Sequence, residues 1–493
     1  MTCAIRLAAC GVLLSLSGCM TTTPAVKPPM SQYADLQPKE VPAFLQDTIY
    51  QRTDLANAGQ QQVSGYGLVV RLDGTGDTRA PNPVREYIRK EMQKHGMGSA
   101  LNGQPTPAPD TILNDPGKRT AIVRLDGFIP PGAHAGQRFD VQVSALENGN
   151  TTSLHHGTVY QADLAPRGAD PFNPGGGVIN PMARVESGEI VINPAYATGD
   201  DTDMSKNQKL SMRYGRLMNK GVVAEERPLV LKLRTPERRL ARQIEMRLNE
   251  RFQDAEGDRF AADNAQNHEH AIGDRAYGKD SPTRMFGRPS RTAVAKDEGE
   301  VWLYVPRKYD TDWEHFAQVA MHTYFNGNSD YATLKAKEMV EVARQDGAKA
   351  PLFNMTYAWE ALGPPAVPVI SPLYSSDVPE VAFAAARAGA YLGDYGAQQV
   401  LARIAQTSSH PFQTTAVDVL GTMPPTAELR MTLRKLLDSE QLLVRVAAYN
   451  AMVASDDPLI VRKDLRNGFA MDMIETEGPP VIYATRVTSR ASR

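Results

Sequence analysis

The C-terminal part of the chain repeats a short apolar pattern, and this repeat constrains the fold more than any other feature. Leu-Gly recurs at 362–363, 392–393 and 420–421, and Ala451-Met452 closes a fourth unit. The Ala-rich stretches between these positions carry apolar side chains at helical spacing. A single unit of this kind cannot bury its apolar stripe, so successive helix pairs are expected to stack. Residues 331–467 therefore predict an array of helical repeats similar to HEAT repeats, with an ordinary helical bundle as the alternative.

Residues 61–253 have a different texture, in which short strands are mixed with two helices. Phe139, Val141 and Val143 alternate with polar residues, which is typical of a half-buried strand. Asn82-Pro83 predicts the start of one helix, and Thr235-Pro236 the start of another. This part and the repeats together predict an α+β protein whose strand-rich region precedes an α-helical domain.

Three smaller segments complete the expected organisation. Residues 254–297 are polar and Gly-rich, so we expect a loop or insert there. Residues 298–330 carry one strand and one helix, and we expect them to return to the strand-rich region. Residues 468–493 predict a C-terminal strand followed by a basic tail.

The first residues are typical of an export signal. Arg6 precedes the apolar run Leu7–Leu14, which is shorter than the roughly 20 residues of a membrane-spanning helix. Leu16-Ser17-Gly18-Cys19 follows, and it resembles the bacterial lipobox, in which the cysteine receives the lipid. We expect residues 1–18 to be the signal peptide and Cys19 to be lipidated, with a plain secretory signal as the alternative.

The segment after the lipobox indicates where the chain is held. Residue 20 is Met rather than Asp, which by resemblance to lipoprotein sorting signals favours an anchor in the outer membrane. Residues 19–60 begin with a Pro-rich stretch and are expected to be a tether. The predicted location is the periplasm, with the lipid in the outer membrane.

Composition excludes several classes of protein. The chain has 54 Lys+Arg against 56 Asp+Glu, a net charge of −2, so it is not a globally basic nucleic-acid binder. Its cysteines are Cys3, Cys10 and Cys19, which leaves no thiol for a disulfide scaffold, a zinc site or a nucleophile in the body. The basic stretch Lys232–Arg251 is either a solvated helix face or a docking face for acidic surfaces.

No motif predicts catalysis, a metal or a cofactor. The turn Leu72–Asp77 lacks the Gly-Lys-Ser/Thr of a phosphate loop, and we interpret it as a tight turn, as we do Gly175–Gly177. His268 and His270 lack the spacing of a zinc-protease helix. His315 and His322 lie seven apart on one predicted helix face, so two metal ligands are conceivable, but we interpret both as surface or half-buried residues. We therefore predict that the protein is not an enzyme, and an envelope hydrolase or metal enzyme stays a minor alternative.

The stretch Gln62-Val-Ser-Gly-Tyr-Gly-Leu-Val-Val-Arg-Leu-Asp-Gly-Thr-Gly-Asp77 resembles the N-terminal signature of the bacterial flagellar P-ring protein family. Further blocks follow in the family's order, and the resemblance covers about residues 62–330. These blocks are Arg119–Val123, Ile129–Gly132, Gly136–Ser144, Ser153–Thr158, Gly215-Arg216 with Gly221–Glu225, Leu229–Pro236, and the strand 300–305 with Pro306. The residues of the signature that we single out for the turn and for assembly are Gly65, Tyr66, Gly67, Asp73, Gly74, Thr75, Gly76 and Asp77.

The resemblance implies a structural subunit of a periplasmic ring that surrounds the flagellar rod and supports motility. It implies contacts with further copies of the chain, with rod and L-ring proteins and with peptidoglycan. Three features depart from the family pattern: the lipobox, Arg71 in place of a glycine, and the helical repeats. An envelope lipoprotein scaffold, which uses the same fold outside the flagellum with a helical protein-binding arm, is the alternative.

Overall fold

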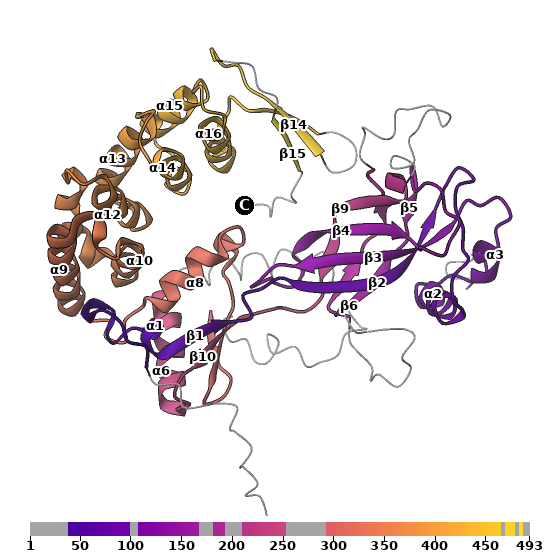
Figure 1. Ribbon diagram of the computed structural model, residues 1–493, viewed down its shortest axis with the longest axis horizontal. Coiled ribbons are helices and arrows are strands. Elements are labelled where there is room, and N and C mark those ends of the chain that lie inside the picture. The colour runs from indigo at the N-terminus through magenta and orange to yellow at the C-terminus, as the bar shows by residue number, and fades with distance from the viewer. Residues whose placement is uncertain are drawn as a thin grey trace, which may run out of the picture.

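The computed structural model describes residues 38–98, 107–166, 181–192, 210–252, 292–464, 469–478 and 483–486. It contains a strand-rich body and a helical array, as the sequence predicts (Figure 1). The α+β class is therefore confirmed. The strand-rich body comprises the described residues up to 328, and the helical array comprises α9 to α16.

A closed sheet forms the larger half of the strand-rich body. Its strand order is β3-β4-β9-β7-β6-β2, and β2 pairs with β3 from Gln61↔Ile129 to Val69↔Ala121, which closes the six strands into a barrel. β5 and β8 extend the sheet beyond β2. The strands are β2 Gln61–Val70, β3 Ala121–Ile129, β4 Arg138–Ala145, β5 Thr158–Val159, β6 Ala162–Pro166, β7 Ala183–Val185, β8 Gly188–Glu189 and β9 Tyr214–Val223.

The alternation of apolar and polar residues in β4 determines which of its side chains face the barrel interior. Phe139, Val141 and Val143 of β4 are buried, whereas the polar residues between them are partly or fully exposed. Helices α2 (Asn82–Lys94) and α3 (Pro109–Leu113) lie at one end of the barrel (Figure 1). α2 buries Val84, Ile88 and Met92 against Leu68 and Ile122 of the barrel strands. Asn82 is the first helical residue rather than the cap, and the preceding Pro81 supplies no side-chain cap.

A second, smaller sheet has the order β1-β10-β12-β11, with all pairs antiparallel. α6 and α8 share one buried apolar cluster with it. The expected start of α6 at Thr235-Pro236 is displaced to Arg238, and Phe252 follows the last helical residue but is buried. The bounds are β1 Thr53–Ala56, β10 Leu229–Leu233, β11 Ala293–Ala295, β12 Glu300–Leu303, α6 Arg238–Arg251 and α8 Trp313–Met321.

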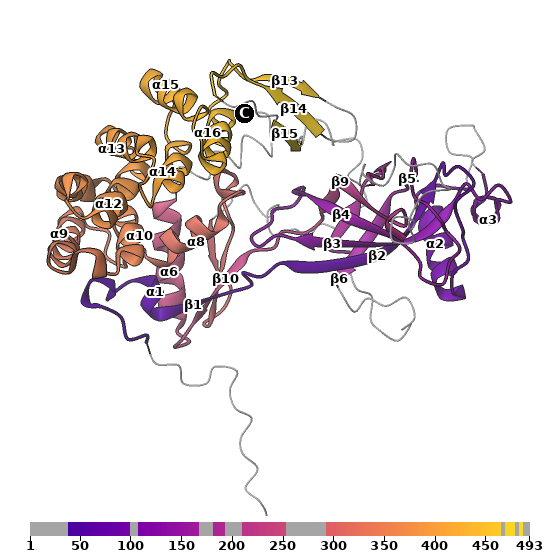
Figure 2. The ribbon, with the colours of Figure 1, turned by 45° about the horizontal axis from the view of Figure 1, so that its top comes forward.

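The helical array curves away from α8 as an arc, with α9, α13 and α15 on its outer side and α10, α14 and α16 on its inner side (Figures 1 and 2). The recurring Leu-Gly pairs mark the C-terminal ends of α10, α12 and α14, where a glycine commonly ends a helix. The bounds are α9 Ser329–Asp346, α10 Leu352–Leu362, α11 Val367–Ile370, α12 Pro379–Tyr391, α13 Tyr395–Gln406, α14 Gln413–Leu420, α15 Ala427–Leu436 and α16 Leu442–Ala454.

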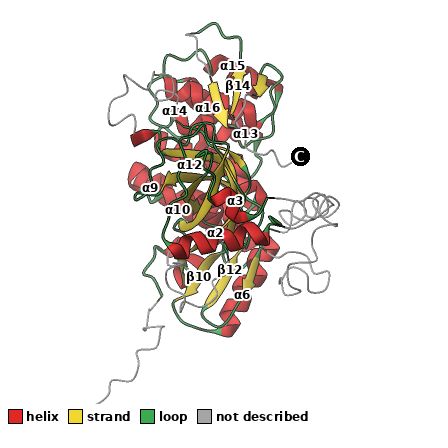
Figure 3. Ribbon diagram, turned by 90° about the vertical axis from the view of Figure 1, so that its right-hand side faces the viewer, coloured by secondary structure: helices red, strands yellow, loops and turns green. Residues whose placement is uncertain are grey.

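A three-stranded antiparallel sheet follows the array (Figure 3), made of β13 Val461–Asp464, β14 Phe469–Met473 and β15 Tyr483–Arg486. Asp472 of β14 is buried and accepts hydrogen bonds from Arg462 and from the Tyr449 hydroxyl of α16. Tyr449 also stacks on Tyr483, with ring centroids 4.0 Å apart. The sheet thus covers one side of the last helix. Its first strand, β13, lies within the range 331–467 that the sequence assigns to helical repeats.

The described part of the expected tether, from residue 38 on, is folded. Phe44 and Leu45, in a short 3₁₀ helix over Ala43–Leu45, belong to the apolar cluster of the helical array. α1 (Ile49–Arg52) follows, and Ile49 belongs to the cluster of the small sheet. This stretch therefore connects the two cores. The N-terminal segment with Cys19, most of the polar insert, Gly175–Gly177, His268, His270 and the basic tail lie outside the described residues.

Candidate functional site

The signature residues lie in the middle of β2 and on the loop that follows this strand. Gly65, Tyr66 and Gly67 are on β2, and Asp73–Asp77 form the loop. A Cβ at Gly65 would overlap the carbonyl oxygen of Asp163, so the strand requires a glycine where β6 comes close. Tyr66 lies on the other side of the sheet, beside the apolar cluster under α2.

The loop is held by backbone hydrogen bonds to the segment before β3. The Leu72 N–H donates to the Arg119 carbonyl at 2.9 Å, and the Gly76 N–H donates to the Lys118 carbonyl at 2.8 Å. A Cβ at Gly76 would overlap the Thr120 carbonyl oxygen. Gly76 therefore has a packing role, as expected for a tight turn.

Thr75 and Asp77 bind the loop at 150–153. The Thr75 hydroxyl donates to the Ser153 carbonyl at 2.8 Å, and the Thr152 N–H donates back to the Thr75 carbonyl at 2.9 Å. The Asp77 carboxylate accepts from the Asn150 N–H at 2.7 Å and the Arg79 N–H at 3.0 Å. Burial alone raises the pKa of Asp77, but these hydrogen bonds and the Arg79 charge outweigh it, so the pKa lies below its ordinary value.

Two residues of the loop point away from the barrel. The Asp73 side chain is 77% exposed and lies 3.2 Å from His156 Nδ1, which is also exposed. Arg71 is exposed and has a φ of 65°, in the left-handed region. The inner residues of the signature thus fix the loop, while Arg71, Asp73 and Gly74 form an accessible tip.

Other candidate residues occupy different places. His315 and His322 are 2% and 0% exposed, so they are more deeply buried than the sequence led us to expect. His315 contacts Glu360 of α10 and Arg387 of α12, two residues that no sequence pattern singled out. Among the described residues, no group of three or more His, Cys, Asp or Glu side chains is arranged to hold a metal ion. Within the same residues, no helix has the length and apolar character needed to span a bilayer.

A family model matches most of the strand-rich body. The family model described as flagellar P-ring protein matches residues 49–270. The match starts in α1, earlier than the resemblance at residue 62, and it ends before β12 and α8. The resemblance read from the sequence is confirmed over this range, and the helical array lies outside it.

Curated relatives give the same result. The chain is 30% identical over 205 residues to a flagellar P-ring protein of Sinorhizobium fredii, which covers 40% of this chain and 48% of the relative. A flagellar P-ring protein of Agrobacterium fabrum is 31% identical over 184 residues, and one of Photorhabdus laumondii is 30% identical over 206 residues. These alignments cover 36% and 40% of this chain, and 42% and 49% of the relatives. The chain thus spans about half the length of the curated relatives it matches.

Proposed function

We propose that this protein is a structural subunit of a periplasmic ring that resembles the flagellar P-ring, surrounds the rod and supports motility. The observation that carries the proposal is the match of residues 49–270 to the P-ring family. The matched range holds the barrel with its signature loop, strands β1 and β10 of the small sheet, and α6. Identical subunits form a ring through head-to-tail contacts that close on themselves.

In this proposal the loop tip contacts the neighbouring copy. Arg71, Asp73 and Gly74 are exposed, whereas Gly76 and Asp77 hold the loop from inside. Reversing one charge at the tip therefore tests assembly without disturbing the loop. We expect Asp73→Arg to leave the fold intact and to prevent ring incorporation. Asp377 is an exposed aspartate before α12, and Asp377→Arg is the matched control that should still enter the ring.

Clean deletion in the source organism tests the flagellar role. We expect the deletion strain to lose swimming in soft agar, with motility restored by the wild-type gene and by Asp377→Arg but not by Asp73→Arg. Electron microscopy of basal bodies from a tagged strain should place the tag in the ring around the rod. Normal swimming of the deletion strain, or basal bodies without the tag, would reject this role.

We further propose that Cys19 carries a lipid that tethers the chain to the outer membrane, on the basis of the lipobox. Cys19→Ala should move the protein from the membrane to the soluble periplasmic fraction and abolish labelling with radioactive palmitate. A mutant that stays membrane-bound, together with an unlabelled wild-type protein, would contradict the tether.

The helical array favours a second candidate function. α9–α16 lie beyond the range that matches the P-ring family, and stacked helix pairs commonly form extended protein-binding surfaces. The chain would then be an envelope scaffold that uses the P-ring-like body outside the flagellum. If the protein is absent from basal bodies and the deletion strain shows envelope defects, the scaffold function is favoured over the ring function.

A further inference from the structure

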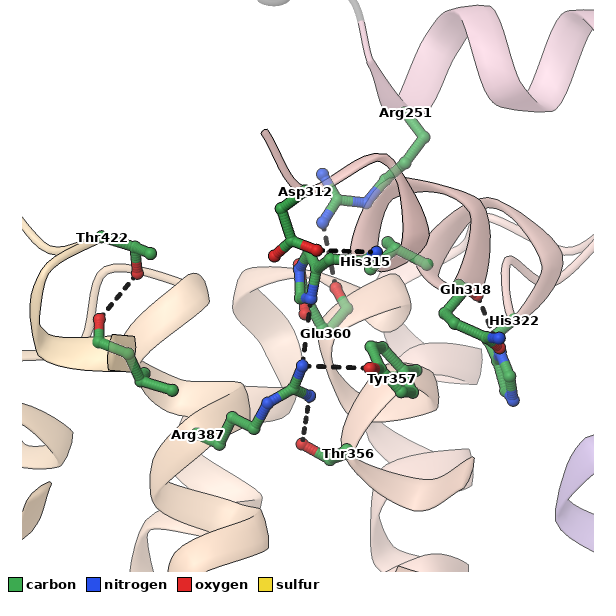
Figure 4. Close-up of polar contacts among 12 residues, drawn as sticks. Arg251, Asp312, His315, Gln318, His322, Thr356, Tyr357, Glu360, Arg387 and Thr422 are labelled. Carbon is green, nitrogen blue, oxygen red and sulfur yellow. Dashed lines mark hydrogen bonds and ion pairs between the residues drawn. The ribbon is translucent and has the colours of Figure 1, made fainter. Parts of the chain in front are cut away.

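A buried polar cluster lies where the helical array meets the strand-rich body. It comprises His315 of α8, Thr356, Tyr357 and Glu360 of α10, and Arg387 of α12 (Figure 4). α8 belongs to the apolar cluster of the small sheet, whereas α12 belongs to that of the array. The polar cluster therefore joins the two parts, and it lies outside both the signature loop and the range that matches the P-ring family.

Arg387 is the centre of the cluster. Its Nη2 lies 3.1 Å from His315 Nδ1 and donates to the Tyr357 hydroxyl at 3.1 Å. Its Nη1 donates to the Thr356 hydroxyl at 3.4 Å. The guanidinium also lies over the Tyr357 ring, 4.5 Å from the centroid. The Arg387 side chain of α12 thus forms hydrogen bonds with residues of both α8 and α10.

These contacts fix the protonation of His315. A guanidinium only donates hydrogen bonds, so Nδ1 of His315 must accept and carries no proton. Nε2 then bears the proton and donates to Glu360 Oε1 at 2.9 Å. The His315 ring therefore links the carboxyl group of Glu360 to the guanidinium of Arg387.

The surroundings leave these groups little access to water. His315 and Glu360 are 2% and 3% exposed, and the His315 ring stacks on Tyr391 at 4.0 Å. The Arg251 guanidinium, at the end of α6, donates to the Glu360 backbone carbonyl at 3.0 Å. Removal of one partner from a buried polar network leaves the other partner unpaired and shielded from water, which is strongly unfavourable. Separation of the two parts at the polar cluster would leave these buried groups without their hydrogen-bond partners.

We propose that Arg387 and His315 act as positioning residues that hold the helical array at one fixed angle to the strand-rich body. The array is then a rigid arm rather than a domain on a flexible hinge. If the chain also forms a ring, which rests on the proposed function, every copy presents its arm at the same radius.

The angle can be measured by distances between spin labels. A chain that begins at Met20 contains every described residue and no native cysteine, because Cys3, Cys10 and Cys19 all precede that start. Exposed Gln243 of α6 and Gln399 of α13 are each replaced by a labelled cysteine. The wild-type background should give one narrow distance distribution. Arg387→Ala and His315→Phe should each broaden it at least twofold.

Controls separate loss of the joint from loss of the fold. Arg344→Ala, an exposed arginine of α9, should leave the distribution unchanged. A second label pair at exposed Lys90 and Gln142, within the barrel region, should stay narrow in all variants. If Arg387→Ala broadens the barrel pair as well, Arg387→Lys decides. Lysine keeps the charge, but its donors all sit on one nitrogen and cannot reproduce the contacts that Arg387 divides between Nη1 and Nη2, so it should broaden only the Gln243–Gln399 pair.

A broad wild-type distribution, or narrow ones in Arg387→Ala and His315→Phe, would overturn the inference. Both outcomes are independent of any flagellar role.

Discussion

Single residues of the signature loop differ in what their backbone requires. Arg71 adopts a φ of 65°, where an L-amino acid is strained by about 1–2 kcal/mol, and its side chain is exposed. The P-ring family signature has a glycine at this position, and a glycine adopts such a φ without strain. Arg71 is therefore tolerated by the fold rather than required by it, which fits a side chain retained for a contact outside the subunit.

Arg71→Gly should stabilise the isolated protein. Relief of the strain exceeds the extra conformational freedom that a glycine gains in the unfolded chain, so we expect about 0.5 kcal/mol in urea unfolding. Gly136→Ala is the matched control, because Gly136 has a φ of 86° and a Cβ there would meet nothing within 4 Å. It should lose about 1 kcal/mol from backbone strain alone. A destabilised Arg71→Gly would show that the arginine side chain supports the fold.

At the scale of elements, the sequence predicted those whose pattern is local. The alternation of Phe139, Val141 and Val143 belongs to the observed β4, and the recurring Leu-Gly pairs lie at the C-terminal ends of α10, α12 and α14. Barrel closure was not predictable, because the β2–β3 pairing depends on contacts between segments about 60 residues apart in the sequence. The folding of residues 43–56 was also missed, since the Pro-rich start of the segment suggested a tether throughout.

The same limit applies to the sites. The turn at Leu72–Asp77 was predicted from its glycines, and its role in assembly stays a prediction. The partners of His315 lie 45 and 72 residues away in the sequence, so no spacing rule connects them. Burial of both histidines follows from α8 packing between the small sheet and α10, which a single helix pattern does not reveal.

α8 also makes the fold sensitive to acid. Burial lowers the pKa of His322 from 6.5, against smaller opposing effects of its hydrogen bonds to Gln318 and Asn354. Below pH 6.5 the unfolded chain binds a proton that the folded protein does not, so stability falls as the pH falls toward the folded pKa. We expect a loss of up to about 1.4 kcal/mol per pH unit in this window, measured by urea unfolding.

His322→Asn is the matched variant for this acid effect, because an amide can still donate to the Gln318 carbonyl but does not titrate. Its unfolding free energy should depend less on pH between 6.5 and 5 than that of the wild type. Gln399→Asn, a change at an exposed residue of the array that does not titrate, should keep the wild-type slope. An equal slope in His322→Asn would assign the acid sensitivity to other groups.

In the whole molecule, the two parts share their cores. Tyr357 and Ala361 of α10 belong to the apolar cluster of the small sheet, and Phe44 and Leu45 from the N-terminal segment belong to that of the array. The Tyr324 hydroxyl donates to the Phe44 carbonyl, and the Ile49 N–H donates to the Thr323 carbonyl at 3.0 Å. The separate periodicities of the sequence suggest parts that fold independently, but these contacts argue for one cooperative unit.

A chain that ends at residue 328 should therefore lose more than its array. Phe44 and Leu45 would lose their cluster, at about 1.5–3 kcal/mol for each side chain returned to water. The remaining body should unfold at lower urea concentration by tryptophan fluorescence and bind a hydrophobic dye. A chain that ends at Asp457, which keeps α9–α16 and removes only β13–β15, should lower the midpoint of the Trp302 and Trp313 signals less, because Phe44 and Leu45 keep their cluster. Equal midpoints for the 328-residue chain and the full chain would show that the strand-rich body is stable alone.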